Sequence, residues 1–252
     1  MGCAPQFGRG ADPTIWGRSD PYVTINKNKD REMGDRRQPH KSPMQQKTSK
    51  TNSRHPHIRN VCVYCGSNPG ADPAYAEAAR KLGEQFARDG VGLVYGGGSL
   101  GLMGELARSV LEHGGRVTGI IPGFLSERER MLREVDELIV VDDMHQRKKL
   151  MFDKSDAFVA LPGGIGTLEE LVEQLTWAQL GRHTKPIVLV DVEGFWAPFV
   201  ELIGHMKAQS FIRPSLDVTF RKVTSVEEVL PTILAAAVPM SEAAEAAVVE
   251  KF

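Results

Sequence analysis

The stretch from Ala160 to Glu170, ALPGGIGTLEE, holds the residue types that an anion-binding turn needs. Its glycines allow backbone N–H groups to turn inward without interference from a Cβ atom, and the following helix adds the positive end of its dipole. Thr167 adds a hydroxyl group. The turn lacks the Gly-Lys-Ser/Thr triplet of nucleoside triphosphatases. A short turn of this kind suits a single phosphate, such as that of a nucleoside monophosphate.

Carboxylates follow this glycine turn directly. A capping box, in which Glu170 reaches back to the N-cap amide beside Thr167, is the purely structural explanation for Glu170. The functional explanation rests on a stripe with helical spacing that begins beside the glycine turn. The stripe consists of Glu170, Glu173, Gln174 and Trp177. Both explanations predict a helix here, and only the functional one predicts a carboxylate in a ligand cleft.

A basic pair lies one strand–helix unit earlier, in MHQRKKLMF. Arg147 and Lys148 share helical spacing with two methionines, so the plain alternative is a helix with a core face and a charged surface. This helix begins at the carboxyl end of a strand, where ligands of parallel sheets bind. We therefore expect the guanidinium of Arg147 to lie near the same cleft as Glu170.

The elements that position these residues alternate between strand and helix from Asn60 onward. The strands read as near-continuous apolar runs, which is typical of parallel strands buried on both faces. We expect a three-layer Rossmann-like α/β domain, with a mainly parallel sheet and helices on both faces. Three glycine-bearing turns follow strands of this sheet: CGSNPG, GGGSLG and LPGGIGT.

The turn GGGSLG, from Gly96 to Gly101, also fits the G-x-G-x-x-G pattern of dinucleotide-binding proteins. That interpretation requires an acidic residue at the end of the next strand, to hold the ribose. The next strand ends in GIIPG, without an acid. We therefore interpret GGGSLG as a tight turn that brings a helix close to the sheet.

Charge divides the chain. Residues 1–59 carry 12 Lys and Arg against 5 Asp and Glu, and the remainder carries 19 against 27. The basic segment has no apolar periodicity and cannot bury enough surface to offset its ordering entropy. We expect a disordered basic tail over 1–59, a folded domain over 60–237 and a flexible C-terminal tail over 238–252. Nucleic-acid binding is expected nowhere except through the basic tail.

No apolar run approaches the roughly 20 residues of a membrane helix, so we expect a cytoplasmic protein without membrane contact. Three cysteines give no disulfide framework. Cys62 and Cys65 match C-x-x-C, but they lie in an expected strand, where residues three apart face opposite sides. We expect two buried cysteines and no metal site.

Taken together, MHQRKKLM, PGGIGTLEE and TWAQLG resemble the LONELY GUY family of cytokinin riboside 5′-monophosphate phosphoribohydrolases. The family pattern P-G-G-x-G-T-x-x-E is matched by residues 162–170, and its Arg-Lys pair by Arg147 and Lys148. The resemblance covers about Asn60 to Ala237, which is the whole expected domain.

The resemblance implies hydrolysis of the N-glycosidic bond of N6-modified adenosine 5′-monophosphates, with AMP as a further candidate substrate, to free base and ribose 5-phosphate. It assigns catalysis to Arg147 and Glu170. It assigns substrate binding to a larger set: Glu129, Lys148, Gly163, Gly164, Gly166, Thr167 and Gln179. It implies no cofactor, and a homodimer whose site is completed across the interface.

Two alternatives stay open. One is a broad purine nucleotide 5′-monophosphate nucleosidase. The other is a non-catalytic module that binds a nucleotide or molybdenum cofactor. Arg147 and Glu170 favour an enzyme, because a carrier has no need for a carboxylate at the sugar carbon C1′.

Overall fold

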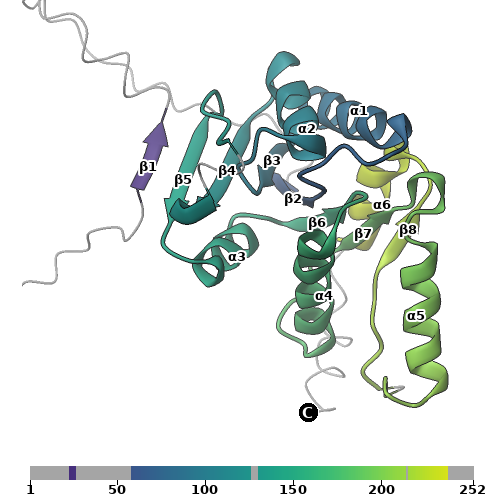
Figure 1. The fold of residues 1–252 in the computed structure, drawn as a ribbon. Helices are drawn as coiled ribbons and strands as arrows, with labels where there is room; N and C mark the ends of the chain where they lie inside the picture. The colour runs from purple at the N-terminus through teal and green to yellow at the C-terminus, as the bar shows by residue number, and fades with distance from the viewer. Residues whose placement is uncertain (1–22, 27–57, 126–129, 214, 238–252) are drawn as a thin grey trace, which may run out of the picture.

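The structure, a computed structural model, describes residues 23–26, 58–125, 130–213 and 215–237. Its centre is an eight-stranded sheet with the order β1-β5-β4-β3-β2-β6-β7-β8 (Figure 1). The strands are β1 Val23–Asn26, β2 Asn60–Tyr64, β3 Gly92–Tyr95, β4 Val117–Pro122, β5 Glu137–Val141, β6 Ala157–Ala160, β7 Ile187–Val190 and β8 Arg221–Val223. The helices are α1 Pro73–Asp89, α2 Gly101–Glu112, α3 Met144–Asp153, α4 Ile165–Gln179, α5 Ala197–Ala208 and α6 Val229–Ala236.

The strand pairings confirm a mainly parallel sheet. All neighbours from β5 across to β8 pair in parallel, and β1 pairs antiparallel with the outer edge of β5. The chain first builds outward from β2 through β3 and β4 to β5, and then returns to place β6 on the other side of β2. The sheet therefore has a topological switch point between β2 and β6.

Successive side chains along the strands belong to two separate hydrophobic layers, one on each face of the sheet. Val61 and Val63 of β2 face α1, α2 and α6, whereas Cys62 and Tyr64 face α3 and α4. Helices thus cover both faces of the sheet, as Figure 1 shows, and the expected three-layer architecture is confirmed. Cys65 falls in the layer opposite Cys62, so the two cysteines cannot form a C-x-x-C redox pair.

Helix α1 illustrates how local signals set the element bounds. The carboxylate of Asp72 accepts a hydrogen bond from the amide of Ala74, and Pro73 occupies the first helical turn. Gly90 ends the helix with a φ of 71°, a left-handed conformation that favours glycine. Both ends of this helix are therefore set by residues of its own first and last turns.

The start of α4 differs from the capping-box explanation. The N-cap is Gly164, with extended backbone angles, and the helix begins at Ile165. Thr167 therefore occupies the N3 position, and Glu170 lies three residues further along the helix. The capping-box explanation of Glu170 is wrong, because the glycines let the helix begin earlier than its first hydroxyl residue.

Two parts of the expected N-terminal tail belong to the fold. Residues 23–26 form β1, whose backbone pairs with β5 from Val23 opposite Val140 to Asn26 opposite Glu137. Ile58 is only 2% exposed and lies in the hydrophobic core. The rest of residues 1–57, and the expected C-terminal tail over 238–252, lie outside the described residues. Among the residues that are described, no helix has the length and apolar character needed to cross a membrane.

Helix α4 also buries an amide that its surroundings do not satisfy. The side chain of Gln174 has no solvent exposure. Neither its Nε2 nor its Oε1 has a hydrogen-bond partner within the described part of the chain. Burying an amide without partners costs roughly 1–3 kcal/mol in proteins. We therefore expect Gln174 to lower the stability of the fold.

We expect Gln174→Met to raise the free energy of unfolding by about 1–3 kcal/mol, because methionine keeps the length of the side chain and removes the unpaired amide. Urea unfolding followed by circular dichroism measures the change. Gln209→Met, at an exposed position after α5, is the matched control and should change stability by less than about 0.5 kcal/mol. A destabilised Gln174→Met variant would show that the amide is satisfied in solution.

Candidate active site

The carboxyl ends of β2 and β6 meet at the switch point of the sheet, and the turns that follow them are locked together. The amide of Gly66, after β2, donates to the carbonyl of Pro162, after β6, at 3.0 Å. A Cβ atom on Gly163 would lie 2.9 Å from the backbone nitrogen of Gly66. Met103 of α2 donates its amide to the carbonyl of Gly66 at 3.3 Å. The glycines permit three chain segments to converge at one point.

A cleft of about 290 Å³ opens beside this junction. Its walls include the first turn of α4 and the side chains of Arg147 and Glu170. Its lining consists of Cys65, Gly66, Ser67, Met103, Arg147, Gly164, Ile165, Gly166, Thr167 and Glu170. The predicted proximity of the basic helix, the glycine turn and Glu170 is therefore present in the structure.

The first turn of α4 presents its backbone to this cleft. A Cβ atom built on Gly164 or on Gly166 would meet no atom within 4 Å, so packing against the protein does not require either glycine. Thr167 is buried, and its side chain lies against Gly163. Open N–H groups at the N-terminus of a 15-residue helix are suited to hold an anion.

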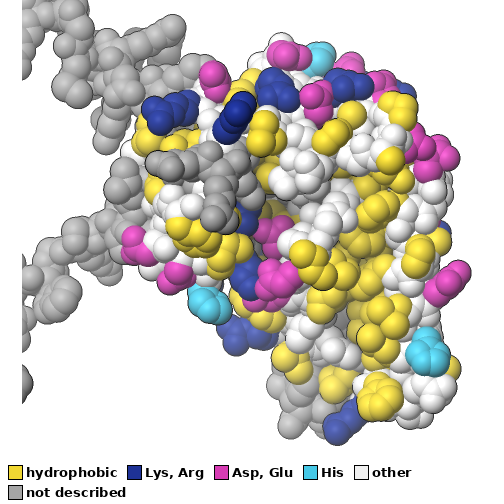
Figure 2. All heavy atoms as spheres, viewed as in Figure 1, with side chains coloured by type: hydrophobic (Ala, Val, Ile, Leu, Met, Phe, Trp, Pro, Cys, Tyr) yellow, Lys and Arg dark blue, Asp and Glu magenta, His cyan; other side chains and the backbone are white. Residues whose placement is uncertain are grey.

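Arg147 and Glu170 form a buried ion pair in the wall of the cleft. Nη1 of Arg147 lies 3.4 Å from Oε1 of Glu170, and the two residues are 6% and 8% exposed. Nε of Arg147 donates to the carbonyl of Ile120 at 3.2 Å, and Nη2 donates to the carbonyl of Gly96 at 3.3 Å. The guanidinium is therefore held in one orientation, with a carboxylate beside it and solvent largely excluded. Figure 2 shows charged side chains of both signs gathered between α3 and α4.

Gly96 contacts Arg147 in a way that the sequence did not reveal. A Cβ atom on this residue would collide with Nη2 of Arg147, so only glycine leaves room for the guanidinium. The G-x-G-x-x-G pattern that begins at Gly96 thus serves the cleft through the bare backbone of its first glycine. GGGSLG is a tight turn, as expected. The same turn also provides the carbonyl and the space that Arg147 occupies.

Lys148 lies beside the Arg147–Glu170 ion pair but does not line the cleft. Its Nζ contacts Oε1 of Glu169 at 2.6 Å and Oε1 of Glu173 at 3.0 Å. Burial alone would lower the pKa of Lys148, but the hydrogen bonds and charges of the two glutamates outweigh it, so its pKa is raised. Lys148 therefore stays an ammonium group that ties α3 to α4.

Two further binding residues implied by the resemblance are not placed in this cleft. Gln179 lies at the opposite end of α4, about 21 Å along the helix from Ile165. There its Nε2 donates to the carbonyl of Leu216 at 2.6 Å. Glu129 lies outside the described residues. The chain that follows it is anchored to the GGGSLG turn, because the amide of Leu132 donates to the carbonyl of Gly97 at 3.1 Å.

Cys65 borders the cleft, yet its chemistry is not that of a nucleophile. Burial, followed by the negative charge of Glu170, raises the pKa of the Cys65 thiol far above its ordinary value. A protonated thiol is a poor nucleophile. Within the described residues, no group of three or more His, Cys, Asp or Glu is placed to hold a metal ion.

A family model described as "Possible lysine decarboxylase" matches residues 103–233, just over half of the chain. The Arabidopsis thaliana protein named "Cytokinin riboside 5'-monophosphate phosphoribohydrolase LOG3" is 48% identical over 158 residues, which cover 63% of this chain and 74% of that protein. This chain belongs to the LONELY GUY family.

A second LONELY GUY relative, from Oryza sativa subsp. japonica, is named "Probable cytokinin riboside 5'-monophosphate phosphoribohydrolase LOGL2". It is 49% identical over 158 residues, which cover 63% of this chain and 65% of the rice protein. The match thus spans slightly less than two thirds of the rice protein. The resemblance predicted from the two motifs is confirmed.

Solved structures share the LONELY GUY fold at lower identity. The molybdenum cofactor carrier protein from Chlamydomonas reinhardtii has a TM-score of 0.53 and 23% identity, covering 71% of this chain and 98% of that chain. The molybdenum cofactor binding protein from Rippkaea orientalis has a TM-score of 0.54 and 21% identity, covering 72% and 98%. These likenesses establish the Rossmann-like fold, which hosts more than one function.

Proposed function

We propose that this chain hydrolyses the N-glycosidic bond of N6-modified adenosine 5′-monophosphates to free base and ribose 5-phosphate. The observation that carries the proposal is the buried Arg147–Glu170 pair in the wall of a cleft whose other wall is the open first turn of α4. The N-terminus of α4 would bind the phosphate, and the pair would face the sugar. The proposed class of base, that of the cytokinins, comes from the names of the relatives.

The proposed reaction separates charge at the sugar. The bond between C1′ and the base nitrogen breaks, its electron pair leaves with the base, and C1′ gains oxocarbenium character. The carboxylate of Glu170 stabilises that charge and accepts a proton from the water that attacks C1′. The departing base takes up one proton, so water is split between the two products. Arg147 orients the substrate and offsets negative charge on the departing base or on the phosphate.

A lysine decarboxylase, which the description of the family model suggests, is disfavoured by the lysine beside this cleft. Lys148 is held as an ammonium between two carboxylates, whereas a lysine that forms a Schiff base needs a neutral amine. Within the described residues, no lysine lines the cleft.

Two alternatives remain proposals of lower support. Broad purine nucleotide nucleosidase activity would use the same machinery with AMP. A molybdenum-cofactor carrier would use the same fold, but it would not require Glu170 to be buried beside an arginine. Base release from isopentenyladenosine 5′-monophosphate and from AMP separates the three functions, because a carrier releases no base from either.

We expect the 5′-monophosphates to be cleaved at least about 100-fold more efficiently, in kcat/KM, than the corresponding nucleosides. Charged hydrogen bonds from a helix N-terminus are worth roughly 1.5–3 kcal/mol each, so two of them supply this factor. Chromatographic measurement of free base from each matched pair checks the expectation. Equal turnover of a nucleoside and its monophosphate would disprove a phosphate role for the α4 turn.

The family resemblance and the surface of the chain support a homodimer. Helix α5 contains no buried residue, although its sequence is largely apolar. Hydrophobic side chains spread over α4 and α5 on the face that Figure 2 shows. The exposed hydrophobic residues of these helices include Val172, Leu202 and Met206. Light scattering, read against the 27.7 kDa mass of one chain, tests this proposal. The cytoplasmic location stays a prediction.

A further inference from the structure

Nη2 of Arg147 donates a hydrogen bond to the carbonyl of Gly96. That carbonyl belongs to a loop that is held in place by residues outside the cleft. This loop, Gly96 to Leu100, connects β3 to α2. Gly97 adopts a φ of 79°, and a Cβ atom on it would lie 3.0 Å from Ile121. The loop is therefore a tight, specific conformation, and any shift in it moves the acceptor that orients the guanidinium.

The same loop also receives the chain that follows residue 129. The amide of Ser99 donates to the carbonyl of Arg130 at 3.1 Å, and the amide of Leu132 donates to the carbonyl of Gly97 at 3.1 Å. Gly98 and Met131 form an antiparallel bridge between the two segments. The loop thus connects the backbone carbonyl that accepts from Arg147 with residues 130–132.

Arg108 of α2 holds this loop through the backbone carbonyl of Ser99. Its Nη1 donates to that carbonyl at 3.0 Å, and its Nη2 contacts Oε1 of Glu105 at 3.1 Å. The carbonyl of Ser99 also packs closely over Gly104, where a Cβ atom would collide with it. The planar guanidinium bridges helix and loop with hydrogen bonds from two separate nitrogens, which its rigid fork holds in fixed directions.

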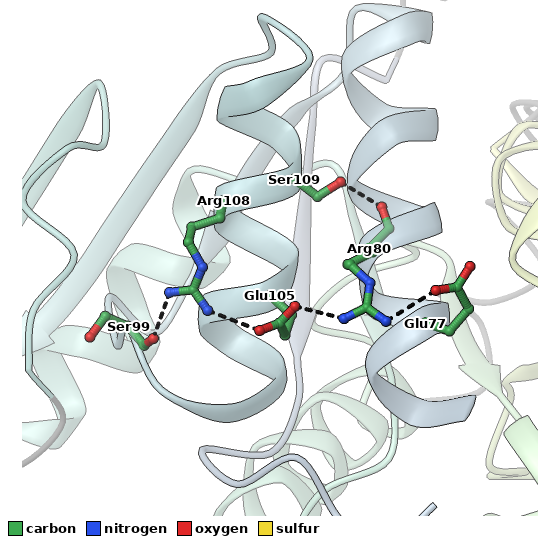
Figure 3. Close-up of polar contacts among 6 residues, drawn as sticks. All are labelled: Glu77, Arg80, Ser99, Glu105, Arg108 and Ser109. Carbon is green, nitrogen blue, oxygen red and sulfur yellow. Dashed lines mark hydrogen bonds and ion pairs between the residues drawn. The ribbon is translucent and has the colours of Figure 1, made fainter. Parts of the chain in front are cut away.

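Glu105 extends the bracing to the neighbouring helix α1. Its Oε2 contacts Nη1 of Arg80 at 2.8 Å, and Nη2 of Arg80 contacts Glu77 at 3.1 Å (Figure 3). The hydroxyl of Ser109 donates to the carbonyl of Arg80 at 2.6 Å, which fixes the two helices at this level. These contacts form one row from α1 across α2 to the loop, as Figure 3 shows.

We propose that Arg108 is a positioning residue for the catalytic pair: it holds the Gly96–Leu100 loop, and through the carbonyl of Gly96 it holds Arg147. This proposal rests on the proposed function for its effect on turnover. Arg108 does not line the cleft, so it acts through the loop and not on the substrate. Misplacing a reacting group by about 1 Å can cost up to roughly 100-fold in rate.

The test compares Arg108→Met with Arg80→Met. Both changes remove a guanidinium that pairs with Glu105, but only Arg108→Met releases the carbonyl of Ser99. We expect Arg108→Met to lower kcat about tenfold with KM changed less than about twofold, because the α4 turn that would bind phosphate is untouched. Arg80→Met should leave both within about twofold, and Arg108→Lys should recover part of the loss. Equal kinetic effects of Arg108→Met and Arg80→Met would overturn the proposal.

Amide hydrogen exchange supplies a measurement that does not depend on activity. In Arg108→Met, exchange at Ser99 and Leu132 should quicken by about tenfold, while Leu93 in β3 stays unchanged as the internal reference. Unchanged exchange at Ser99 and Leu132 would refute the bracing role, whatever the kinetics. The two proposals can also fail separately. If the wild-type protein releases no base, but exchange quickens as expected in Arg108→Met, the proposed function is refuted and the bracing of the loop still holds.

Discussion

Glu170→Gln is expected to lower kcat for base release by about 10²–10⁴, with the protein still folded. Glutamine has nearly the shape of glutamate, so the packing around this 8% exposed residue is preserved. The amide cannot stabilise positive charge at C1′ or accept a proton from water. Steady-state kinetics with isopentenyladenosine monophosphate, together with a thermal unfolding curve, measure the two quantities.

The structure sharpens this expectation, because α4 begins at Ile165 and Glu170 is not part of its cap. Loss of activity in Glu170→Gln therefore cannot be assigned to a weakened helix start. Glu169→Gln is the matched control, since Glu169 is the preceding residue on the same helix and its side chain is 52% exposed. The control should change kcat less than about threefold. If Glu170→Gln kept near-normal kcat, the proposed role of the carboxylate would be wrong.

Arg147→Ala is expected to lower kcat/KM by about 10²–10³, the effect of losing one preorganised donor at a site where charge develops. The substitution also leaves Glu170 without its ion-pair partner and the carbonyls of Gly96 and Ile120 without their donor. Loss of stability should therefore accompany loss of activity. Kinetics and urea unfolding must be measured on the same preparation.

Arg147→Lys separates the two effects. Lysine keeps a positive charge beside Glu170 but lacks the fork that reaches both backbone carbonyls, so it should recover stability more than turnover. Lys149→Ala, on the exposed side of the same helix, is the control and should leave kcat/KM within about twofold. An Arg147→Ala protein within about threefold of normal kcat/KM would show that Arg147 only anchors α3 to the sheet.

Several features of the site follow from periodicity and turn chemistry alone. Apolar runs alternating with helical spacing predict parallel strands and covering helices. In such a sheet every helix begins at the same edge, and this places the segments that carry Arg147 and Glu170 side by side. The observed contact of 3.4 Å between Arg147 and Glu170 agrees with that expectation. The caps of α1 are equally local, because Asp72, Pro73 and Gly90 act on their own turns of backbone.

Other features depend on contacts between distant parts of the chain. Arg147 is oriented by carbonyls 27 and 51 positions away, and nothing in the spacing of its own helix indicates which carbonyls these are. They are selected by the order of β3 and β4 in the sheet. The same holds for Gly96, whose missing side chain serves a residue of another helix. The register of β1 on β5 joins residues 111 to 117 positions apart, from Asn26 opposite Glu137 to Val23 opposite Val140, and no short pattern predicted that strand.

The candidate site residues of this protein can therefore be predicted from its sequence, because residue types at strand ends and helix starts are set by local backbone geometry. The contacts that orient those side chains cannot be predicted in the same way. The carbonyl that Gln179 contacts and the groups that hold Arg147 follow from packing in three dimensions. Local spacing specifies which side chains share a face, whereas only the folded sheet brings residues far apart in sequence within hydrogen-bonding distance.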